Sequence, residues 1–318
     1  MTTTPTTPTA PTTPRHPATR RIAANPIPYW ARAGKTREVF EQAFADLQDI
    51  GFTAVKADVP EGMSAGEYAD WIAGFGLSPS LSLFSSPLDE TVDTGEVLEQ
   101  ARRFAAVQAE LGMDRAMLSS MSLPARLRTP AVGADFDAGR LERAIENAGR
   151  VCEVLIAEGV RPLHHSHVGG VFETEEEVTR LLDTLGADLI GFGPDTGHLR
   201  WAGADPVALI ERYSDRIGGI HLKDVYPDHL DAARGGGDYR TVSGSGRLWA
   251  EPGRGVLDLA AVLAALPADY DGDYMIEVDH PSVETLHESH RLSYEWARST
   301  LEPLLRNGSA EPSHDGAR

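Results

Sequence analysis

The chain has 318 residues, of which 41% are apolar and 24% are charged, enough for one large α/β barrel or two ordinary domains. Its 29 basic and 48 acidic residues give a net charge of -19, which argues against nucleic acid or an anionic membrane as a partner. One cysteine, Cys152, excludes an internal disulfide framework, and no apolar run of about 18 residues is present. These features predict a cytoplasmic globular protein.

The first 20 residues are almost entirely Thr, Pro and Ala, and they predict a disordered tail because they carry little apolar surface. After them, short apolar runs alternate with longer segments of helical periodicity. The predicted strands lie at 21–27, 52–58, 78–84, 114–120, 160–166, 188–193, 216–224 and 273–279. Residues 306–318 predict a second disordered tail, which leaves one catalytic domain at 21–305.

Helical patterns follow these strands, most clearly at 36–51, 96–112, 174–186 and 284–305. Several of them end in Gly, as helix C-termini prefer. Eight strand–helix pairs over about 290 residues favour a single closed (β/α)8 TIM barrel. An open doubly wound sheet is the alternative, because the sequence does not show whether the sheet closes.

Polar residues gather at the carboxyl ends of predicted strands five to eight, which is where active sites of such barrels lie. Strands one to four offer less: Asn25, Tyr29, Lys56, Asp58 and several serines. In chain order, strands five to eight carry His164, His165, His167, Asp195, His198, His221, Lys223, Asp224, Glu277 and Asp279. The ionisable groups therefore concentrate on one side of the barrel mouth.

Carboxylates and histidines brought together in this way would repel one another and compete for protons unless a cation lies between them. Each residue alone has an ordinary role: a strand-end histidine is more often a hydrogen-bonded rim residue, Asp195 fits a helix N-cap, and Glu277 fits an ion pair. Four neighbouring strands sharing the pattern favour one catalytic divalent ion. Mixed nitrogen and oxygen ligands suit Mn2+, Co2+, Fe2+ or Zn2+ better than Ca2+.

Several sequence blocks then carry a resemblance. They are "LHHSHVGG", "DTGHLRWAGADP", "RIGGIHLKDV", "EPGRGVLDLAAVL" and "MIEVD", in this order and spacing. They resemble successive blocks of the xylose isomerase-like TIM-barrel superfamily, the sugar phosphate isomerase/epimerase type. Within it they most resemble the inosose (2-keto-myo-inositol) dehydratase group.

The resemblance implies one ligand from each of strands five to eight: His165, Asp195, His221 and Glu277. His164 or His167 replaces His165 if the register of strand five differs, because alternate residues of a strand point to opposite faces. The resemblance also implies that His198 binds substrate or supports the ligands. The implied ion is Mn2+ or Co2+, with Zn2+, Fe2+ or Mg2+ as alternatives.

This chain departs from the dehydratase group at the substrate rim. It has "EVDHPS" at the end of strand eight, "VKAD" in strand two where the group usually offers a Glu, and Arg254 where the group carries an acidic or small residue. Residues 232–255 predict a mobile lid in which Trp249 closes over an uncharged polyol, with Arg254 as a further substrate contact. A phosphate-binding loop or a solvated loop is the alternative.

The expected enzyme is a metal-dependent carbon–oxygen lyase that dehydrates a keto-polyol, such as 2-keto-myo-inositol, through a metal-stabilised enediolate. Glu277, His167 and Lys223 are the candidate bases, although Lys223 also fits a simple rim ion pair with Asp224 or Glu277. The alternatives are a sugar isomerase or epimerase and β-elimination on a 3-keto-glycoside. An abasic-site DNA endonuclease is disfavoured by the charge, and a non-catalytic sugar-binding barrel has no need of the four-strand cluster. The expected partner is a small polyol or keto-sugar, and a second copy of the chain is compatible with the sequence.

Overall fold

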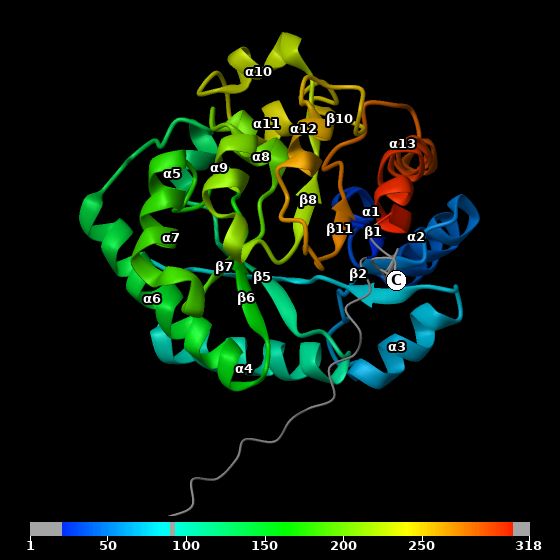
Figure 1. Cartoon of the computed structure of the whole chain (residues 1–318), viewed down its shortest axis with the longest axis horizontal. Coiled ribbons are helices and arrows are strands. Elements are labelled where there is room, and N and C mark those ends of the chain that lie inside the picture. Colours follow the sequence, from blue (N-terminus) through cyan, green and yellow to red (C-terminus); the bar gives the residue numbers. More distant parts are fainter. Residues whose placement is uncertain (1–20, 90–92, 308–318) are drawn as a thin grey trace, which may run out of the picture.

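A computed structural model describes residues 21–89 and 93–307, in which strands and helices alternate around a barrel (Figure 1). The strands are β1 (Ile22–Ala24), β2 (Ala54–Lys56), β3 (Ser78–Ser80), β4 (Leu83–Ser86), β5 (Arg115–Ser120), β6 (Arg161–His164), β7 (Gly191–Phe192), β8 (Ile220–Leu222), β9 (Asp224–Val225), β10 (Trp249–Ala250) and β11 (Tyr274–Ile276). The helices are α1 (Ile27–Ala33), α2 (Arg37–Ile50), α3 (Ala65–Ala73), α4 (Thr94–Glu110), α5 (Pro124–Arg128), α6 (Ala138–Ala157), α7 (Glu175–Leu189), α8 (Thr196–Trp201), α9 (Pro206–Arg212), α10 (Pro227–Ala233), α11 (Tyr239–Ser243), α12 (Leu259–Ala264) and α13 (Leu286–Asn307).

The predicted tail at 1–20, and residues 308–318 of the second one, lie outside the described residues. Helix α13 extends to Asn307, two residues beyond the predicted domain boundary at 305. The division into one domain and two tails stays a prediction.

Parallel pairing closes the barrel. One sheet has the order β3-β2-β1-β11-β8, and a second has the order β4-β5-β6-β7. Strands β3 and β4 are the two halves of predicted strand three, because only Leu81 and Ser82 separate them and each half pairs with a different neighbour. On the other side, the parallel bridges Phe192 to Ile217 and Asp195 to His221 join β7 to β8. The predicted (β/α)8 barrel is confirmed, with its third strand broken in the middle.

The barrel interior is filled by side chains from strands all around it. One apolar cluster joins Ala23, Ala54, Leu81, Met117, Leu163 and Met275. Since these residues belong to different strands and contact one another, they face inward. Glycine provides room beside them, because a Cβ at Gly193 would lie 2.3 Å from Met117 Sδ. This inner layer fixes which residues of each strand point into the barrel.

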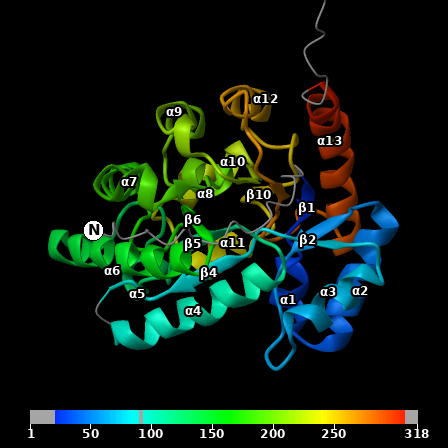
Figure 2. The same cartoon turned by 60° about the horizontal axis from the view of Figure 1, so that its bottom comes forward.

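The alternate strand residues face the surrounding helices. Val55 and Leu118 belong to the main core, together with Phe40 and Phe44 of α2. Helix α2 begins at its N-cap Thr36 and ends at Gly51, whose φ of 108° favours glycine. It packs beside α13, as Figure 2 shows. Within the described ranges, no helix is long and apolar enough to cross a membrane.

The chain between β8 and α12, which contains β9, α10, α11 and β10, forms a small structure, and α10, α11 and β10 lie together at one end of the molecule (Figure 1). Strands β9 and β10 pair antiparallel. The carboxylate of Asp224 accepts hydrogen bonds from four backbone N–H groups, those of Val225, Gly253, Gly255 and Leu257. An apolar cluster that includes Trp201, Val225, Leu248 and Trp249 holds this structure against the barrel. We call this cluster the roof. Part of the predicted lid is therefore packed structure, and Trp249 is fully buried within it.

Candidate metal centre

The predicted ligands follow the inner layer by two residues along their strands. His165 follows Leu163, Glu277 follows Met275, and Asp195 follows Gly193. Strand alternation therefore turns them into the barrel at its carboxyl end. His164 points the other way, where its ring lies edge-on to Phe172 and stacks with Phe192.

Three of the four predicted ligands form a compact buried group: His165, Asp195 and His221, whose ligand atoms lie within 4.8 Å of one another. Asp195 Oδ2 lies 3.9 Å from both His165 Nε2 and His221 Nδ1. Ligand atoms about 2.0–2.2 Å from one ion are at most about 4.4 Å apart, so the two spacings of 3.9 Å fit one ion. Asp195 Oδ1 also accepts a hydrogen bond from His198 N at 2.9 Å, which makes Asp195 the N-cap of α8.

The buried polar atoms of this group fit a bound cation. Asp195 Oδ2 is buried and accepts no hydrogen bond from the described residues, although Lys223 Nζ lies 3.2 Å away. Lys223 supplies one positive charge to three buried carboxylates, those of Asp195, Glu277 and Asp279, so a further cation would balance the remaining charge. Two imidazoles and a carboxylate are donors typical of first-row divalent metals.

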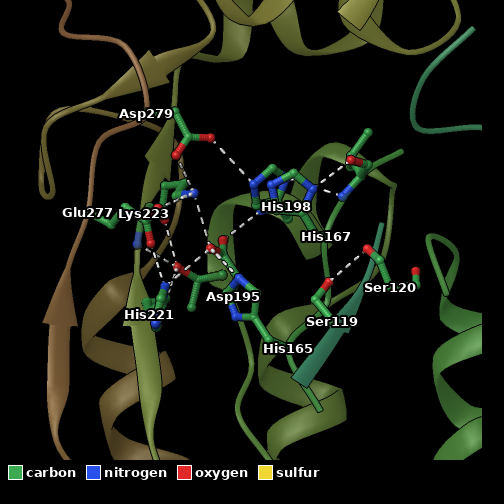
Figure 3. A network of polar contacts seen from close by, with 12 residues as sticks. Ser119, Ser120, His165, His167, Asp195, His198, His221, Lys223, Glu277 and Asp279 are labelled. Atoms are coloured by element: carbon green, nitrogen blue, oxygen red, sulfur yellow. Dashed lines mark hydrogen bonds and ion pairs between the residues drawn. The ribbon is translucent and has the colours of Figure 1, made fainter. Parts of the chain in front are cut away.

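The fourth predicted ligand, Glu277, reaches the group through His221, whose Nδ1 is hydrogen-bonded to Glu277 Oε2. Glu277 and Asp279 lie on the same face, and Lys223 lies between them and Asp195 (Figure 3). Lys223 Nζ is 2.8 Å from Asp279 and 3.4 Å from Glu277. The ion pair of Lys223 with Glu277 is as predicted. The alternative partner was wrong, since Asp224 turns away to bind backbone N–H groups.

Burial and charge decide the protonation of the cluster. Burial lowers the pKa of His165 and His198 well below the ordinary value. Burial also opposes the charge of Lys223, but Asp195, Asp279 and Glu277 outweigh it and hold the pKa of Lys223 well above its usual range. The imidazoles of His165 and His198 are therefore neutral, the form that can bind a metal, and Lys223 is an ammonium group.

Two further histidines continue the cluster toward the roof. The ring centroids of His167 and His198 are 3.8 Å apart, and His198 Nε2 lies 3.4 Å from Asp279 Oδ2. Trp249 flanks His198 at 5.0 Å between ring centroids and has Lys223 Nζ 4.8 Å from its ring. The predicted residues His167, His198, Lys223 and Trp249 are thus brought together beside the metal group.

Arg254 lies elsewhere. It is exposed, unlike the buried residues of the cluster. Two neighbours of the cluster were missed as functional candidates. Tyr239 of α11 stacks on His167 at 6.0 Å, and no sequence signal marks it. Asp279 was noted only as a strand-end residue, although its position two residues after Glu277 places it on the same face.

Known proteins resemble this chain in sequence. Inosose dehydratase of Geobacillus kaustophilus (strain HTA426) is 34% identical over 164 residues, which are 51% of this chain and 52% of that protein. The rhizopine catabolism protein MocC of Rhizobium meliloti is 32% identical over 212 residues, 66% of this chain and 60% of that protein. The chain therefore matches about half the length of the first relative and 60% of the second. The predicted resemblance to the inosose dehydratase group is confirmed.

Solved structures show the same fold. An IolI protein with a bound zinc atom has a TM-score of 0.66 at 12% identity and covers 89% of this chain and 98% of its own. L-ribulose 3-epimerase has a TM-score of 0.65 at 19% identity and covers 93% of this chain and 100% of its own. The profile of the xylose isomerase-like TIM barrel family matches residues 44–300, most of the chain, and the chain therefore belongs to this family.

Proposed function

We propose that the protein is a divalent-metal-dependent dehydratase of a keto-polyol such as 2-keto-myo-inositol. The observation that carries this proposal is the buried group of His165, Asp195 and His221, with Glu277 hydrogen-bonded to His221. The relatives named inosose dehydratase favour a dehydration over other reactions of this fold.

These four residues would hold one ion, Mn2+ or Co2+ in our proposal. His221 Nδ1 faces both Asp195 and Glu277, so the same nitrogen is directed toward both carboxylates. When bound, the ion would polarise the ketone of the substrate and stabilise the negative charge that develops as the adjacent carbon loses its proton.

His167 is our preferred base for that proton. Its Nδ1 lies 2.7 Å from the carbonyl oxygen of Val168, so Nδ1 carries the hydrogen and Nε2 keeps a lone pair. Burial lowers the pKa of His167 to about 4, so the ring is neutral at pH 7. Lys223 is a weaker candidate than the sequence suggested, because three carboxylates hold its proton. We assign Lys223 the role of balancing their charge.

The test is a reaction in heavy water with 2-keto-myo-inositol and added Mn2+ or Co2+. We expect a product that has lost water, with new ultraviolet absorbance, and no requirement for NAD. Chelation should abolish the reaction and added metal should restore it. Deuterium incorporation without loss of water, for keto-inositol and keto-sugars alike, would instead identify an epimerase or isomerase.

A further inference from the structure

Lysine is rare in this chain: only three of the 29 basic residues are Lys, at positions 35, 56 and 223. Lys35 is exposed and pairs with Asp58, with 2.6 Å between Nζ and Oδ2. Lys223 is buried among the carboxylates of the metal centre. Lys56 is the last residue of β2, and it has neither the surface ion pair of Lys35 nor the buried carboxylate neighbours of Lys223.

The side chain of Lys56 points into the barrel. Ala54 belongs to the inner cluster and Val55 to the outer core, so strand alternation turns Lys56 inward. Strand β2 lies four positions around the barrel from β7, counting β3 and β4 as one strand. Lys56 therefore occupies the wall opposite Asp195, which follows β7.

Residues of this wall are more exposed than those of the metal centre. Lys56 and Leu83 are half-buried, and Ser85, two residues beyond the inward Leu83, is exposed. By contrast, His165 and Asp195 are only 3% and 0% exposed. A ligand that reaches the metal centre from this side has Lys56 beside it.

The ammonium group of Lys56 has no close partner among the described residues. Within residues 21–89 and 93–307, Nζ of Lys56 makes no ion pair or hydrogen bond. Only the backbone of Lys56 has a side-chain partner in this part of the chain, because its carbonyl oxygen accepts a hydrogen bond from the hydroxyl of Tyr68 at 3.3 Å. On the opposite wall, Lys223 together with one divalent ion would balance the charges of Asp195, Glu277 and Asp279. A ligand between the two walls therefore meets a balanced metal centre on one side and a free ammonium group on the other.

We propose that Lys56 is a specificity-determining residue that binds an anionic oxygen of the substrate, a carboxylate or a phosphate remote from the ketone. The ammonium of lysine is a compact point charge that suits such a group. The inference rests on the proposed function for the ketone and names a preferred subset of its substrates, keto-polyols that also carry an acidic group.

Lysine acetylation of the metal-loaded protein tests this without turnover. With three lysines, peptide mass spectrometry follows each site separately, and exposed Lys35 is an internal control. We expect 5-keto-gluconate or fructose 6-phosphate to slow the acetylation of Lys56 several-fold, and 2-keto-myo-inositol to have little effect. Comparing the two acids distinguishes carboxylate from phosphate recognition. Equal protection by the neutral compound, or none by either acid, would overturn the proposal.

Calorimetry on Lys56→Gln, Lys56→Arg and Lys35→Gln provides a second measurement. Losing a hydrogen bond to a charged group costs about 1.5–3 kcal/mol, so Lys56→Gln should weaken binding of the acidic ligand by about 10-fold to 150-fold. Binding of the neutral ligand should change little, Lys56→Arg should retain much of the affinity, and Lys35→Gln should match the wild type. Acid binding that depends on Lys56 but without dehydration would refute the function and keep this inference. Dehydration of neutral and acidic substrates at equal efficiency would support the proposed function and refute this inference.

Discussion

Two consecutive histidines at the end of β6 have opposite environments. His165 faces Asp195 and His221, whereas His164 packs between Phe172 and Phe192. Burial lowers the pKa of His164 to about 3, so its ring remains neutral in the core. The difference arises only from the alternation of side chains along an extended strand.

We expect His165→Ala to weaken metal affinity by at least about 100-fold, more than the 10-fold to 100-fold loss typical of a residue that only supports a ligand. His164→Ala should lower stability by about 1–3 kcal/mol, because it removes a packed ring, and should leave metal affinity nearly unchanged. Competition with a chromophoric chelator measures the affinity, and urea unfolding measures the stability. Metal binding that depends on His164 instead would mean that the register of this strand end is wrong.

At the scale of elements, a side chain of the neighbouring helix α5 fixes the position of the segment between β6 and α7. Arg126 of α5 is buried and donates to the carbonyl oxygens of Gly170 and Val171 at 2.8 and 2.9 Å. The same guanidinium forms a bidentate ion pair with buried Glu177 of α7. This segment carries His167, so the pair connects two helices to the position of our proposed base.

Removing Arg126 should therefore be costly. Arg126→Met leaves Glu177 buried without its cation, which typically costs about 3–5 kcal/mol of unfolding free energy. The matched control is Arg180→Gln, which breaks the exposed pair with Glu142 and should cost at most about 1 kcal/mol. Denaturant unfolding of both variants measures the difference. Similar losses of unfolding free energy in the two variants would show that the buried pair contributes no more to stability than the exposed pair.

At the scale of the whole molecule, the metal centre joins elements that are far apart in sequence. His165, Asp195 and His221 follow or belong to three different strands, and Glu277 follows a fourth. A bound ion would tie these strands together only in the folded barrel. Metal binding would therefore be coupled to global stability.

Added Mn2+ or Co2+ should raise the melting temperature of the metal-free protein. At a free concentration of 100 times Kd, binding to the folded state alone contributes about 2.7 kcal/mol. For a domain of this size this corresponds to a shift of about 4–5 °C. In Asp195→Asn the amide oxygen can still accept from His198 N and cap α8, so the fold should persist while the shift disappears. An equal shift in this variant would place the ion elsewhere.

Local sequence patterns determined most of the fold. The alternation of apolar runs and helical segments located all eight barrel strands, and the strand ends supplied His165, Asp195 and His221. The thiol of Cys152 is buried in α6, a segment of helical periodicity. These features depend on the periodicity of apolar and polar residues over a short stretch of chain, which can be read directly from the sequence.

Only the tertiary structure decided the contacts between segments that are distant in the chain. The break of strand three at Leu81, the placement of Lys223 among three carboxylates and the stacking of Tyr239 on His167 all depend on strand stagger and on packing of the roof. The sequence placed Lys56 within a predicted strand at 52–58, but only the structure made it the last residue of β2 and placed it opposite the metal centre. Barrel closure and side-chain packing determine which residues become neighbours around the barrel. The periodicity of the sequence within a few residues does not predict these neighbours.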